Sequence, residues 1–490
     1  MNQTPHLPRL KWTRDLQNLL LALSLVLTLL VFWGPPLLSS LERPSVQGVL
    51  EQRQLELQAL ASQAVVKENF IILSPDQNAP LLSRQLLGAD ALRELAAVLQ
   101  QRQDNATTTD RDLRLRQVLV LLAMDQPEQS SPLLESLRSA QGQGQGESSA
   151  AIILQQALVQ RAVGDQVTAA ELEGLGDEAL EDALPHHPLY QSLACSVLDL
   201  DRPFCAGSHA GALVRLALVS LVGPLAAGVG ILLWLVQLGR FLWPWKRSPL
   251  PPSPPPATPP LTIPALLLFF FGGVVVLGNG AGALALLALR PWVQASSSAG
   301  QAMATMVVYG AQALPGLAVL RWLRGREGQS GWQWLQLQWG LGWRSFPMAL
   351  GGLLLSLPLV LLASWGVSQL FPDAGGSNPL LDLVLNSRDR TALVFFALTA
   401  CLLAPLYEEL VFRATILPVM ARSYGAGVGV LLSSLLFAAA HLSLVEFFPL
   451  LILGLGLGWL RLRSGRLSAC VLMHAAWNGY TLANLMLLSL

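Results

Sequence analysis

A series of long apolar runs constrains this chain more than any other feature of its sequence. A helix needs about 20 apolar residues to cross the hydrocarbon core of a bilayer, and helices buried in soluble proteins rarely need so many. The hydrophobic share of 52% and the charged share of 13% agree with a membrane protein, because soluble domains carry roughly twice as much charge. The runs lie at 19–38, 216–238, 261–289, 298–320, 347–371, 391–419, 427–446, 447–460 and 467–488.

We therefore expect an all-α fold, a polytopic transmembrane helix bundle of about eight or nine spans with an N-terminal helical soluble domain. The number of spans depends on Glu446–Pro449, where one helix either ends or only bends. The protein is then a multi-pass integral membrane protein, of the cell surface or of an internal membrane, and the lipid bilayer is its first partner.

Residues 41–210 differ from the apolar runs, because their apolar positions alternate with polar faces at helical spacing. The spacing is clearest over 82–99, 113–123 and 150–163. We expect a helical soluble domain without a catalytic cluster, and the sequence leaves its partner open. His186 and His187 do not indicate a metal site, since no nearby carboxylate or thiolate completes one.

These patterns divide the chain into six parts. A proline-rich stretch, which cannot be helical, supplies one boundary as an extended linker. The parts are a cytoplasmic lead with the first membrane anchor (1–40), the helical soluble domain (41–210), a transmembrane helix (211–247), the proline-rich linker (248–260), transmembrane helices with a loop (261–344) and a C-terminal membrane core (345–490).

Basic clusters at the ends of the spans predict the orientation of the chain, because cytoplasmic loops are enriched in Lys and Arg. The clusters are Arg9/Lys11/Arg14, Lys246/Arg247, Arg321/Arg324/Arg326 and Arg461/Arg463/Arg466. They predict a cytoplasmic N-terminus and an extracytosolic 41–210 domain. There Cys195 and Cys205 either form a disulfide or stay reduced. With 31 basic and 31 acidic residues, the chain has no net field that would attract nucleic acid.

Ionisable residues inside apolar spans cost about 2.5–3.5 kcal/mol each on insertion, so each needs a reason. Glu408, Glu409 and Arg413 lie in one such span. Glu409 and Arg413 are four residues apart on a helix and can neutralise one another. Glu408 has no such local partner, and a carboxylate in that situation is suited to take and return protons near neutrality. We therefore expect Glu408 to be the general base.

Two histidines and an asparagine follow in the same region. His441 ends a run of small residues that lets neighbouring helices approach, and His474 and Asn478 share one helix face. A turn near Ser423–Gly427 would bring Glu408 and His441 to a similar depth, whereas His474 needs a tilted or broken helix to join them. Taken singly, such residues are more often solvated or structural, but their combination favours a chemical site.

The residues Glu408-Glu409-x-x-x-Arg413, Phe437-x-x-x-His441 and His474-x-x-x-Asn478 resemble the three motifs of the CPBP intramembrane proteases. This family comprises type II CAAX prenyl endopeptidases and bacteriocin-processing enzymes, also named abortive-infection proteins. The resemblance covers roughly 345–490, with its core in 391–488, and residues 1–260 have no counterpart in it.

The resemblance implies an intramembrane endopeptidase that cuts peptide or membrane-protein substrates. Glu408 with His441 would activate a water molecule, while His474 and Asn478 would donate hydrogen bonds to the oxyanion. Glu409 and Arg413 would hold the helix and its charge balance, with Phe437 in support. We expect no cofactor.

Zinc is the alternative, because the family has often been labelled metallopeptidase, and Glu408, His441 and His474 would then be its ligands. Against it, the chain lacks the His-Glu-x-x-His pattern of a helical zinc site.

Two other functions stay in view. One is a catalytically inactive membrane scaffold or immunity-type protein, and the other is a transporter whose buried charges line a path. Intact motifs favour the enzyme over the scaffold. A transporter predicts inverted internal repeats, which the sequence does not contain. The identity of the substrate, and whether it is prenylated, cannot be read from the residues.

Overall fold

The structure is a computed structural model, and every regular element in the part of the chain that it describes is helical. The described residues are 14–40, 46–67, 90–105, 110–141, 149–164, 172, 174–206, 210–242, 257–259, 261–325, 333–337, 343–371, 383–384, 387 and 389–489. Most of the proline-rich linker, and Arg9, Lys11, Lys246, Arg247 and Arg326 of the basic clusters, lie outside these residues.

The chain forms two compact units, which we describe separately. We call Met1–Val46 together with Gly223–Leu490 the membrane unit, and Gln47–Val222 the helical unit.

Seven helices in the described residues are long and apolar enough to cross a membrane. They are Asp15–Ser39, Gly211–Leu242, Ile263–Gln294, Ser298–Leu323, Ser345–Leu370, Arg390–Tyr424 and Leu444–Ser464. The polytopic helical fold is thus confirmed, with fewer such helices than the eight or nine expected. The difference comes from α21 (Ala426–Ala440), which has only 15 residues, and from α23 (Leu467–Ser489), whose His474 and Asn478 make it more polar.

The predicted break at Glu446–Pro449 lies several residues too late. The chain turns at His441–Ser443, where Leu442 has a φ of 54°, and α22 (Leu444–Ser464) then continues through Pro449. Ser443 begins this helix, because its hydroxyl accepts a hydrogen bond from the backbone N–H of Glu446 at 3.2 Å. His441 therefore stands at the end of a helix, beside a turn.

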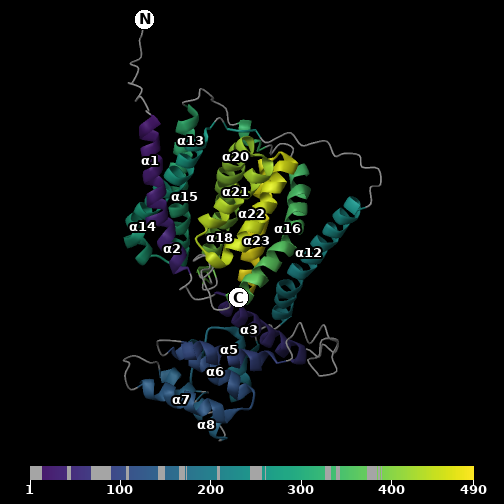
Figure 1. The fold of residues 1–490 in the computed structure, drawn as a ribbon. Helices are drawn as coiled ribbons and strands as arrows, with labels where there is room; N and C mark the ends of the chain where they lie inside the picture. Colours follow the sequence, from purple (N-terminus) through teal and green to yellow (C-terminus); the bar gives the residue numbers. More distant parts are fainter. Residues whose placement is uncertain are drawn as a thin grey trace. The chain divides into compact units, whose positions relative to one another are not determined.

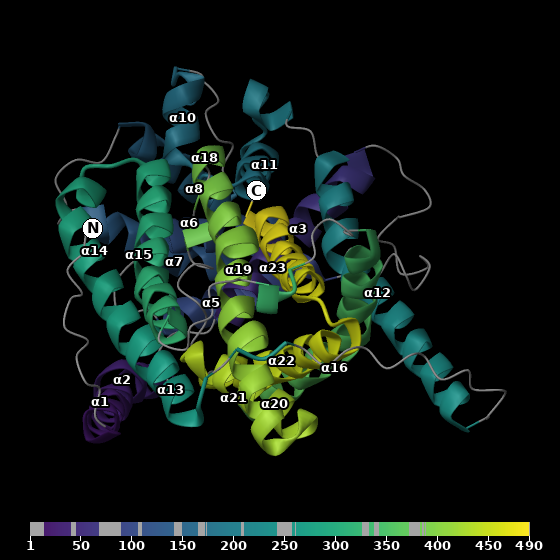
Figure 2. The same ribbon diagram turned by 90° about the horizontal axis from the view of Figure 1, so that it is seen from above.

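The central element of the membrane unit is the long helix that carries the two adjacent glutamates. It consists of α18 (Arg390–Leu398), η7 (Thr399–Leu403), α19 (Ala404–Glu409), η8 (Leu410–Ile416) and α20 (Leu417–Tyr424). Figures 1 and 2 both show it between α15 (Ser298–Gly325) and α23. The segments η7 and η8 are π-helical, and such wider turns occur most often at functional sites.

The remaining helices of the membrane unit surround this element. They are α1 (Arg14–Leu27), η1 (Thr28–Trp33), α2 (Gly34–Ser39), α12 (Ala210–Leu242, which begins in the helical unit), α13 (Ile263–Leu267), η4 (Leu268–Leu277), α14 (Gly278–Gln294), α16 (Ser345–Leu370), α21 and α22. Buried aromatic rings pack beside the central helix, with Phe412 edge-to-face against both Phe270 and Phe437 at ring distances of 5.8 and 5.3 Å. Each such pair contributes about 0.5–1.5 kcal/mol beyond the burial of apolar area.

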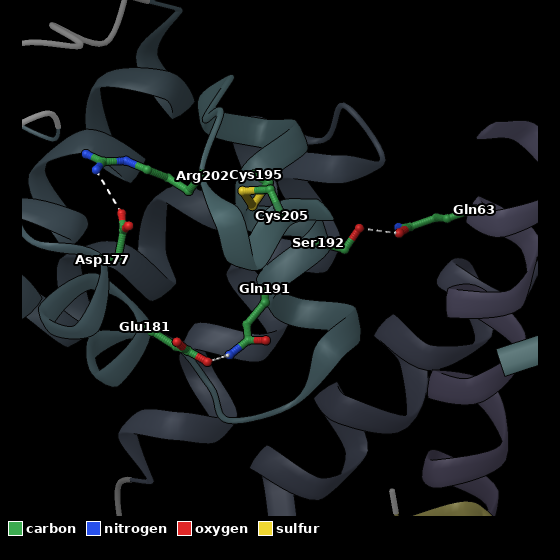
Figure 3. The surroundings of a disulfide bond; sticks show 8 residues. All are labelled: Gln63, Asp177, Glu181, Gln191, Ser192, Cys195, Arg202 and Cys205. Atoms are coloured by element: carbon green, nitrogen blue, oxygen red, sulfur yellow. Dashed lines mark hydrogen bonds and ion pairs between the residues drawn. A yellow bond between two sulfur atoms is a disulfide. The ribbon is translucent and has the colours of Figure 1, made fainter. Parts of the chain in front are cut away.

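The helical unit contains helices over the predicted stretches 113–123 and 150–163 and over the end of the stretch 82–99, whose residues 82–89 lie outside the described residues. Its helices include α3 (Val46–Lys67), α5 (Ala91–Asn105), α6 (Arg111–Ala123), α7 (Pro127–Gln141), α8 (Ser149–Val163), α10 (Asp177–Ala183) and α11 (Pro188–Leu198). Asp110 begins α6, because its carboxylate accepts the backbone N–H groups of Asp112 and Leu113. Cys195 of α11 forms a disulfide with Cys205, ten residues later (Figure 3).

Glu56 of α3 is fully buried inside the helical unit and is surrounded by donors. Gln52 and the hydroxyl of Tyr190 each donate to it at 2.7 Å. Arg53 lies at 3.2 Å and Arg116 at 3.4 Å.

His187 also faces Glu56, with its Nε2 atom 3.4 Å from the carboxylate. The expectation that no carboxylate lies near this histidine is therefore wrong. The partner comes from a helix more than a hundred residues earlier in the chain, so sequence spacing could not reveal it.

Candidate active site

Adjacent glutamates on the central helix point to different surroundings, as their helical positions require. Glu409 is fully buried, and its Oε1 atom receives Arg413 at 3.0 Å and the Nδ1 atom of His474 at 2.8 Å. The ion pair expected between Glu409 and Arg413 is present. Its link to His474 was not expected, because that residue lies on a different helix.

Arg413 is itself fully buried and is held on two further sides. Its guanidinium donates to the carbonyl of Gly454 at 3.2 Å and lies over the ring of Phe437 at 4.4 Å. Removing one partner from a buried ion pair typically costs about 3–5 kcal/mol. The pair Glu409–Arg413 is therefore a rigid support on which His474 is oriented.

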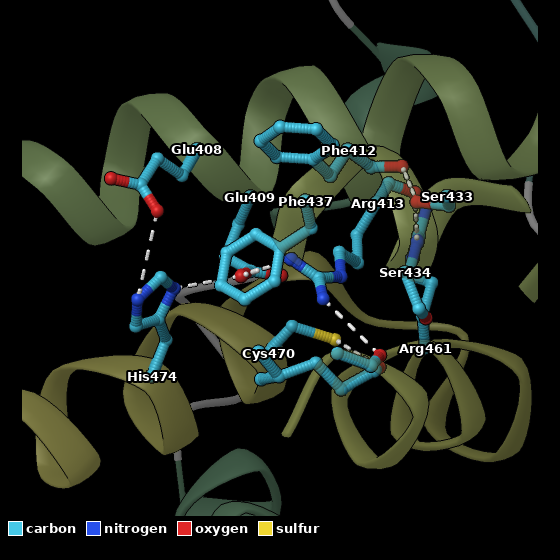
Figure 4. A network of polar contacts seen from close by, with 12 residues as sticks. Glu408, Glu409, Phe412, Arg413, Ser433, Ser434, Phe437, Arg461, Cys470 and His474 are labelled. Carbon is cyan, nitrogen blue, oxygen red and sulfur yellow. Dashed lines mark hydrogen bonds and ion pairs between the residues drawn. The ribbon is translucent and has the colours of Figure 1, made fainter. Parts of the chain in front are cut away.

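Glu408 faces the two histidines that the sequence singled out. Its Oε2 atom lies 3.8 Å from Nε2 of His474 and 4.0 Å from Nε2 of His441. Figure 4 shows the carboxylate of Glu408 directed at the ring of His474, with Glu409 behind the other ring nitrogen. The side chains of Glu408 and His441 are 20% and 25% exposed, so small molecules can reach this point.

The ring nitrogens of both histidines can be assigned from their partners. Nδ1 of His441 lies 2.8 Å from the carbonyl of Phe437, which can only accept, so this nitrogen carries the hydrogen. Nδ1 of His474 faces the carboxylate of Glu409, which is ionised beside Arg413, so it too carries the hydrogen. In their neutral forms both imidazoles therefore present an Nε2 lone pair to Glu408.

Phe437 packs against three of the polar groups of the site. It is fully buried, and its ring lies edge-to-face against His441 at 4.8 Å and His474 at 5.6 Å. Together with Arg413 on its face, these contacts fix both imidazoles. These contacts explain why a phenylalanine stands at the start of the motif Phe437-x-x-x-His441.

Asn478 is not linked to Glu408 or to either histidine by any contact in the described residues. Its side-chain amide donates to the carbonyl of Ala400 at 2.7 Å. In a π-helical turn that carbonyl would be bonded by the N–H five residues later, which is Pro405 and has none. Asn478 supplies the missing donor. An amide nitrogen carries two hydrogens, so this bond occupies one of them.

Oε2 of Glu408 and the Nε2 atoms of His441 and His474 are also the atoms that a metal ion would use as ligands here. In a tetrahedral zinc site with bonds of about 2.0–2.2 Å, neighbouring ligand atoms lie roughly 3.4 Å apart. The separations of 3.8 and 4.0 Å are wider than this. In the described part of the chain, no group of three or more His, Cys, Asp or Glu residues is arranged to hold a metal ion. The spacing fits a hydrogen-bonded water better than zinc.

Sequence reasoning missed two residues near the site. Tyr309 of α15 donates from its hydroxyl to Oε1 of Glu408 at 3.3 Å. Arg461 was grouped with the basic residues at the cytoplasmic ends of the spans, but it is fully buried and donates to the carbonyl of Arg413 at 3.3 Å and to Gln336 at 2.8 Å. Tyrosines, and arginines at the ends of membrane helices, are common near membrane interfaces. The sequence therefore did not indicate that either residue lies near the site.

The fold and this site define a polytopic membrane protein with a Glu–His cluster among its transmembrane helices. Residues 390–480, which include all four candidate residues, match the family described as type II CAAX prenyl endopeptidase Rce1-like. This part of the chain is similar to the CPBP/CAAX protease family, whose members are hydrolases. No curated protein and no solved structure matches the chain.

Proposed function

We propose that the protein is an intramembrane endopeptidase in which Glu408 activates a water molecule. The observation that carries this proposal is the convergence of three acceptor atoms from three helices, at separations of 3.8 and 4.0 Å. A water hydrogen-bonded at about 2.8 Å to each acceptor fits between atoms so spaced.

The number of hydrogen-bond donors and acceptors around this water determines the charge state in which all of them are paired. Water donates two hydrogen bonds, so it can satisfy two of the three acceptors, and the third must carry a proton of its own. We assign this proton to His474, because the carboxylate of Glu409 at its Nδ1 stabilises an imidazolium. Glu408, Glu409, Arg413 and His474 are then neutral as a group, which limits the cost of burying them.

The reaction follows from these positions. Oε2 of Glu408 takes one proton from the water, and the hydroxide attacks the carbonyl carbon of the scissile peptide bond. The bond between this carbon and the amide nitrogen then breaks, and Glu408 returns the proton to the leaving nitrogen. His441 orients the water through its Nε2 lone pair. The water is consumed, and the products are one new carboxyl group and one new amine.

His474 and Asn478 would stabilise the oxyanion of the tetrahedral intermediate. Protonated His474 can donate from Nε2, and Asn478 has one amide hydrogen beyond the one bound to Ala400. Loss of a single oxyanion donor costs about 3–4 kcal/mol in proteases where this has been measured. We propose no cofactor for this mechanism.

The substrates we propose are peptides or membrane proteins that reach the site from the bilayer, with prenylated C-terminal tails as the first class to test. We also propose a cytoplasmic N-terminus and an extracytosolic helical unit. The basic clusters support this orientation, and so does the disulfide between Cys195 and Cys205, since disulfides persist in oxidising compartments. We assign no partner to the helical unit, and the charge balance of the whole chain does not favour nucleic acid.

The test uses the purified full chain in lipid nanodiscs and two fluorogenic peptides with the same Cys-aliphatic-aliphatic-X end, one of them prenylated on the cysteine. We expect cleavage of at least the prenylated peptide. Glu408→Ala should lower turnover by about 10²–10⁴-fold, while Asp15→Ala, in the first span, should not change it. Unchanged turnover in the Glu408 variant would remove the assignment, and an inert wild-type protein would favour a scaffold.

Treatment with a chelator distinguishes the metal-free carboxylate mechanism from a zinc-dependent one. A mechanism in which a carboxylate activates water needs no metal, so turnover should survive dialysis against a strong chelator. Loss of turnover that added zinc restores would instead assign Glu408, His441 and His474 as ligands.

A further inference from the structure

The strongest further feature of the site is a hydrogen bond from outside the segment that matches the protease family. Tyr309 lies on α15, well before residue 390, where that segment begins. Its hydroxyl donates to Oε1 of Glu408 at 3.3 Å. Within the described residues, this is the side-chain contact of Glu408 at hydrogen-bonding distance, because both imidazole nitrogens lie farther away.

The position of Tyr309 is fixed by contacts along the length of α15. Near the start of the helix, the backbone N–H of Ala299 donates to Asp389, which begins α18, at 3.1 Å. At its centre, the ring of Tyr309 lies edge-to-face against Tyr407, with ring centres 6.4 Å apart. Further along, Gly316 leaves room for the hydroxyl of Tyr407, which a Cβ atom there would strike. Together these contacts set both the register of α15 and its distance from the central helix.

This hydrogen bond distinguishes the two oxygens of Glu408. A phenol that donates to a carboxylate holds the group in one orientation. Because Oε1 is bound by Tyr309, the oxygen left facing His441 and His474 is Oε2. The hydroxyl comes from a helix that packs against the central one, so it does not depend on the local turn that carries Glu408.

We propose that Tyr309 is a positioning residue, which holds Oε1 of Glu408 and so presents Oε2 as the oxygen that takes the proton from water. This inference rests on the proposed endopeptidase activity and extends the site beyond the matched family segment. Tyr309 acts through Glu408 and needs no contact with the substrate.

The test is kcat and KM for Tyr309→Phe, measured with the full chain in nanodiscs and whichever fluorogenic peptide the wild type cleaves. Without the donor, the carboxylate of Glu408 can rotate away from the orientation that takes the proton, so kcat should fall by roughly 10-fold. KM and the thermal unfolding temperature should change little, because Tyr309 does not contact the substrate and its ring is kept.

Tyr407→Phe is the matched control. It removes a hydroxyl from the neighbouring ring, and that hydroxyl has no hydrogen-bond partner among the described protein groups. Its kcat and KM should equal those of the wild type.

A purely structural role for Tyr309 predicts that kcat falls together with the thermal unfolding temperature, and that result would overturn the inference. So would a kcat equal to that of the wild type. Either outcome leaves the proposed protease intact provided that Glu408→Ala is inactive, so the two hypotheses fail separately.

Discussion

Each of the two units contains a glutamate that faces histidine and tyrosine, and the two clusters are in opposite states of hydrogen bonding. In the helical unit, Glu56 meets His187 and Tyr190, together with two arginines and a glutamine. In the membrane unit, Glu408 meets two histidines and Tyr309. Residue types alone therefore do not distinguish a structural cluster from a reactive one.

The difference lies in which nitrogen of each imidazole carries the hydrogen. His187 begins α11, and its Nδ1 atom accepts the backbone N–H of Leu189 at 3.2 Å. Its Nε2 therefore carries the hydrogen and points a donor at Glu56. His441 and His474 are bound in the reverse way, so each points a lone pair at Glu408. Every acceptor of Glu56 is satisfied, whereas the site around Glu408 is completed only by a proton and a water.

The comparison predicts its largest effect for Glu408→Gln. The amide keeps the shape of the side chain and can still accept from Tyr309, but it cannot take a proton. We expect turnover to fall by about 10²–10⁴-fold. The thermal unfolding temperature should not fall, because no lysine or arginine in the described part of the chain pairs with this carboxylate. Turnover and unfolding should be measured in the same detergent.

The control is Glu178→Gln, which changes an exposed carboxylate of the helical unit and should leave both measurements unchanged. A marked loss of stability in Glu408→Gln would contradict the comparison, because it would mean that Glu408 is held as firmly as Glu56.

For Glu56→Gln we expect the opposite result, a loss of stability without a loss of turnover. The amide cannot accept from all the surrounding donors, and Arg53 and Arg116 lose their buried counter-charge. Disrupting a buried charge network in this way should cost about 3–5 kcal/mol of stability. Hydrogen exchange of the full chain should show faster exchange in α3, α6 and α11, with little change in α18–α23. Protein that remains folded should cleave peptide at the wild-type rate.

Much of this arrangement could be predicted from the sequence, and the rest has physical reasons for being hidden. Long apolar runs revealed most spans, and the pair Glu409–Arg413 followed from helix periodicity alone. The break at His441–Ser443 was misplaced because Pro449, a usual marker of an interruption, is accommodated inside α22, while Leu442 adopts a positive φ that no glycine signals.

Interactions between distant segments were beyond the reach of a single sequence. Tyr309 reaches Glu408 from a helix nearly a hundred residues away, and Arg461 turns inward to the backbone of Arg413. Asn478 was expected to face an oxyanion, and its bond to Ala400 depends on a π-helical turn that apolar periodicity does not report. Spacing thus identified the residues of the site, and tertiary packing decided how each is bound.

The pH dependence of stability gives a third test. Burial lowers the pKa of His187 from 6.5 to about 4, although the neighbouring Glu56 opposes this. Above pH 6.5 the imidazole is neutral in both the folded and the unfolded chain, and its full contribution to stability is present. As the pH falls from 6.5 toward 4, only the unfolded chain takes up the proton. The helical unit should therefore lose up to roughly 3 kcal/mol of stability over this window.

His187→Asn separates this effect from a general acid sensitivity. Asparagine is also a good residue for the start of a helix, but it does not titrate. In hydrogen exchange of α11 at pH 7, 5.5 and 4.5, the wild type should lose protection as the pH falls and the variant should lose less. Equal losses would indicate that His187 is protonated in the folded protein, and its contrast with His441 and His474 would then disappear.

The smallest effect is expected from the disulfide, which belongs to the helical unit alone. Cys195 and Cys205 enclose a short loop, and a crosslink of this length stabilises by about 2–3 kcal/mol through loss of freedom in the unfolded chain. The double variant Cys195→Ser/Cys205→Ser should unfold at a lower temperature and lose protection in α11. Because it leaves Cys401 and Cys470 in place, it isolates the disulfide more cleanly than a reducing agent.

Peptide turnover by the folded variant should equal that of the wild type, since none of the groups around Glu408 belongs to this loop. A parallel fall in turnover would show that the helical unit supports the site, and the two acids could no longer be treated as independent.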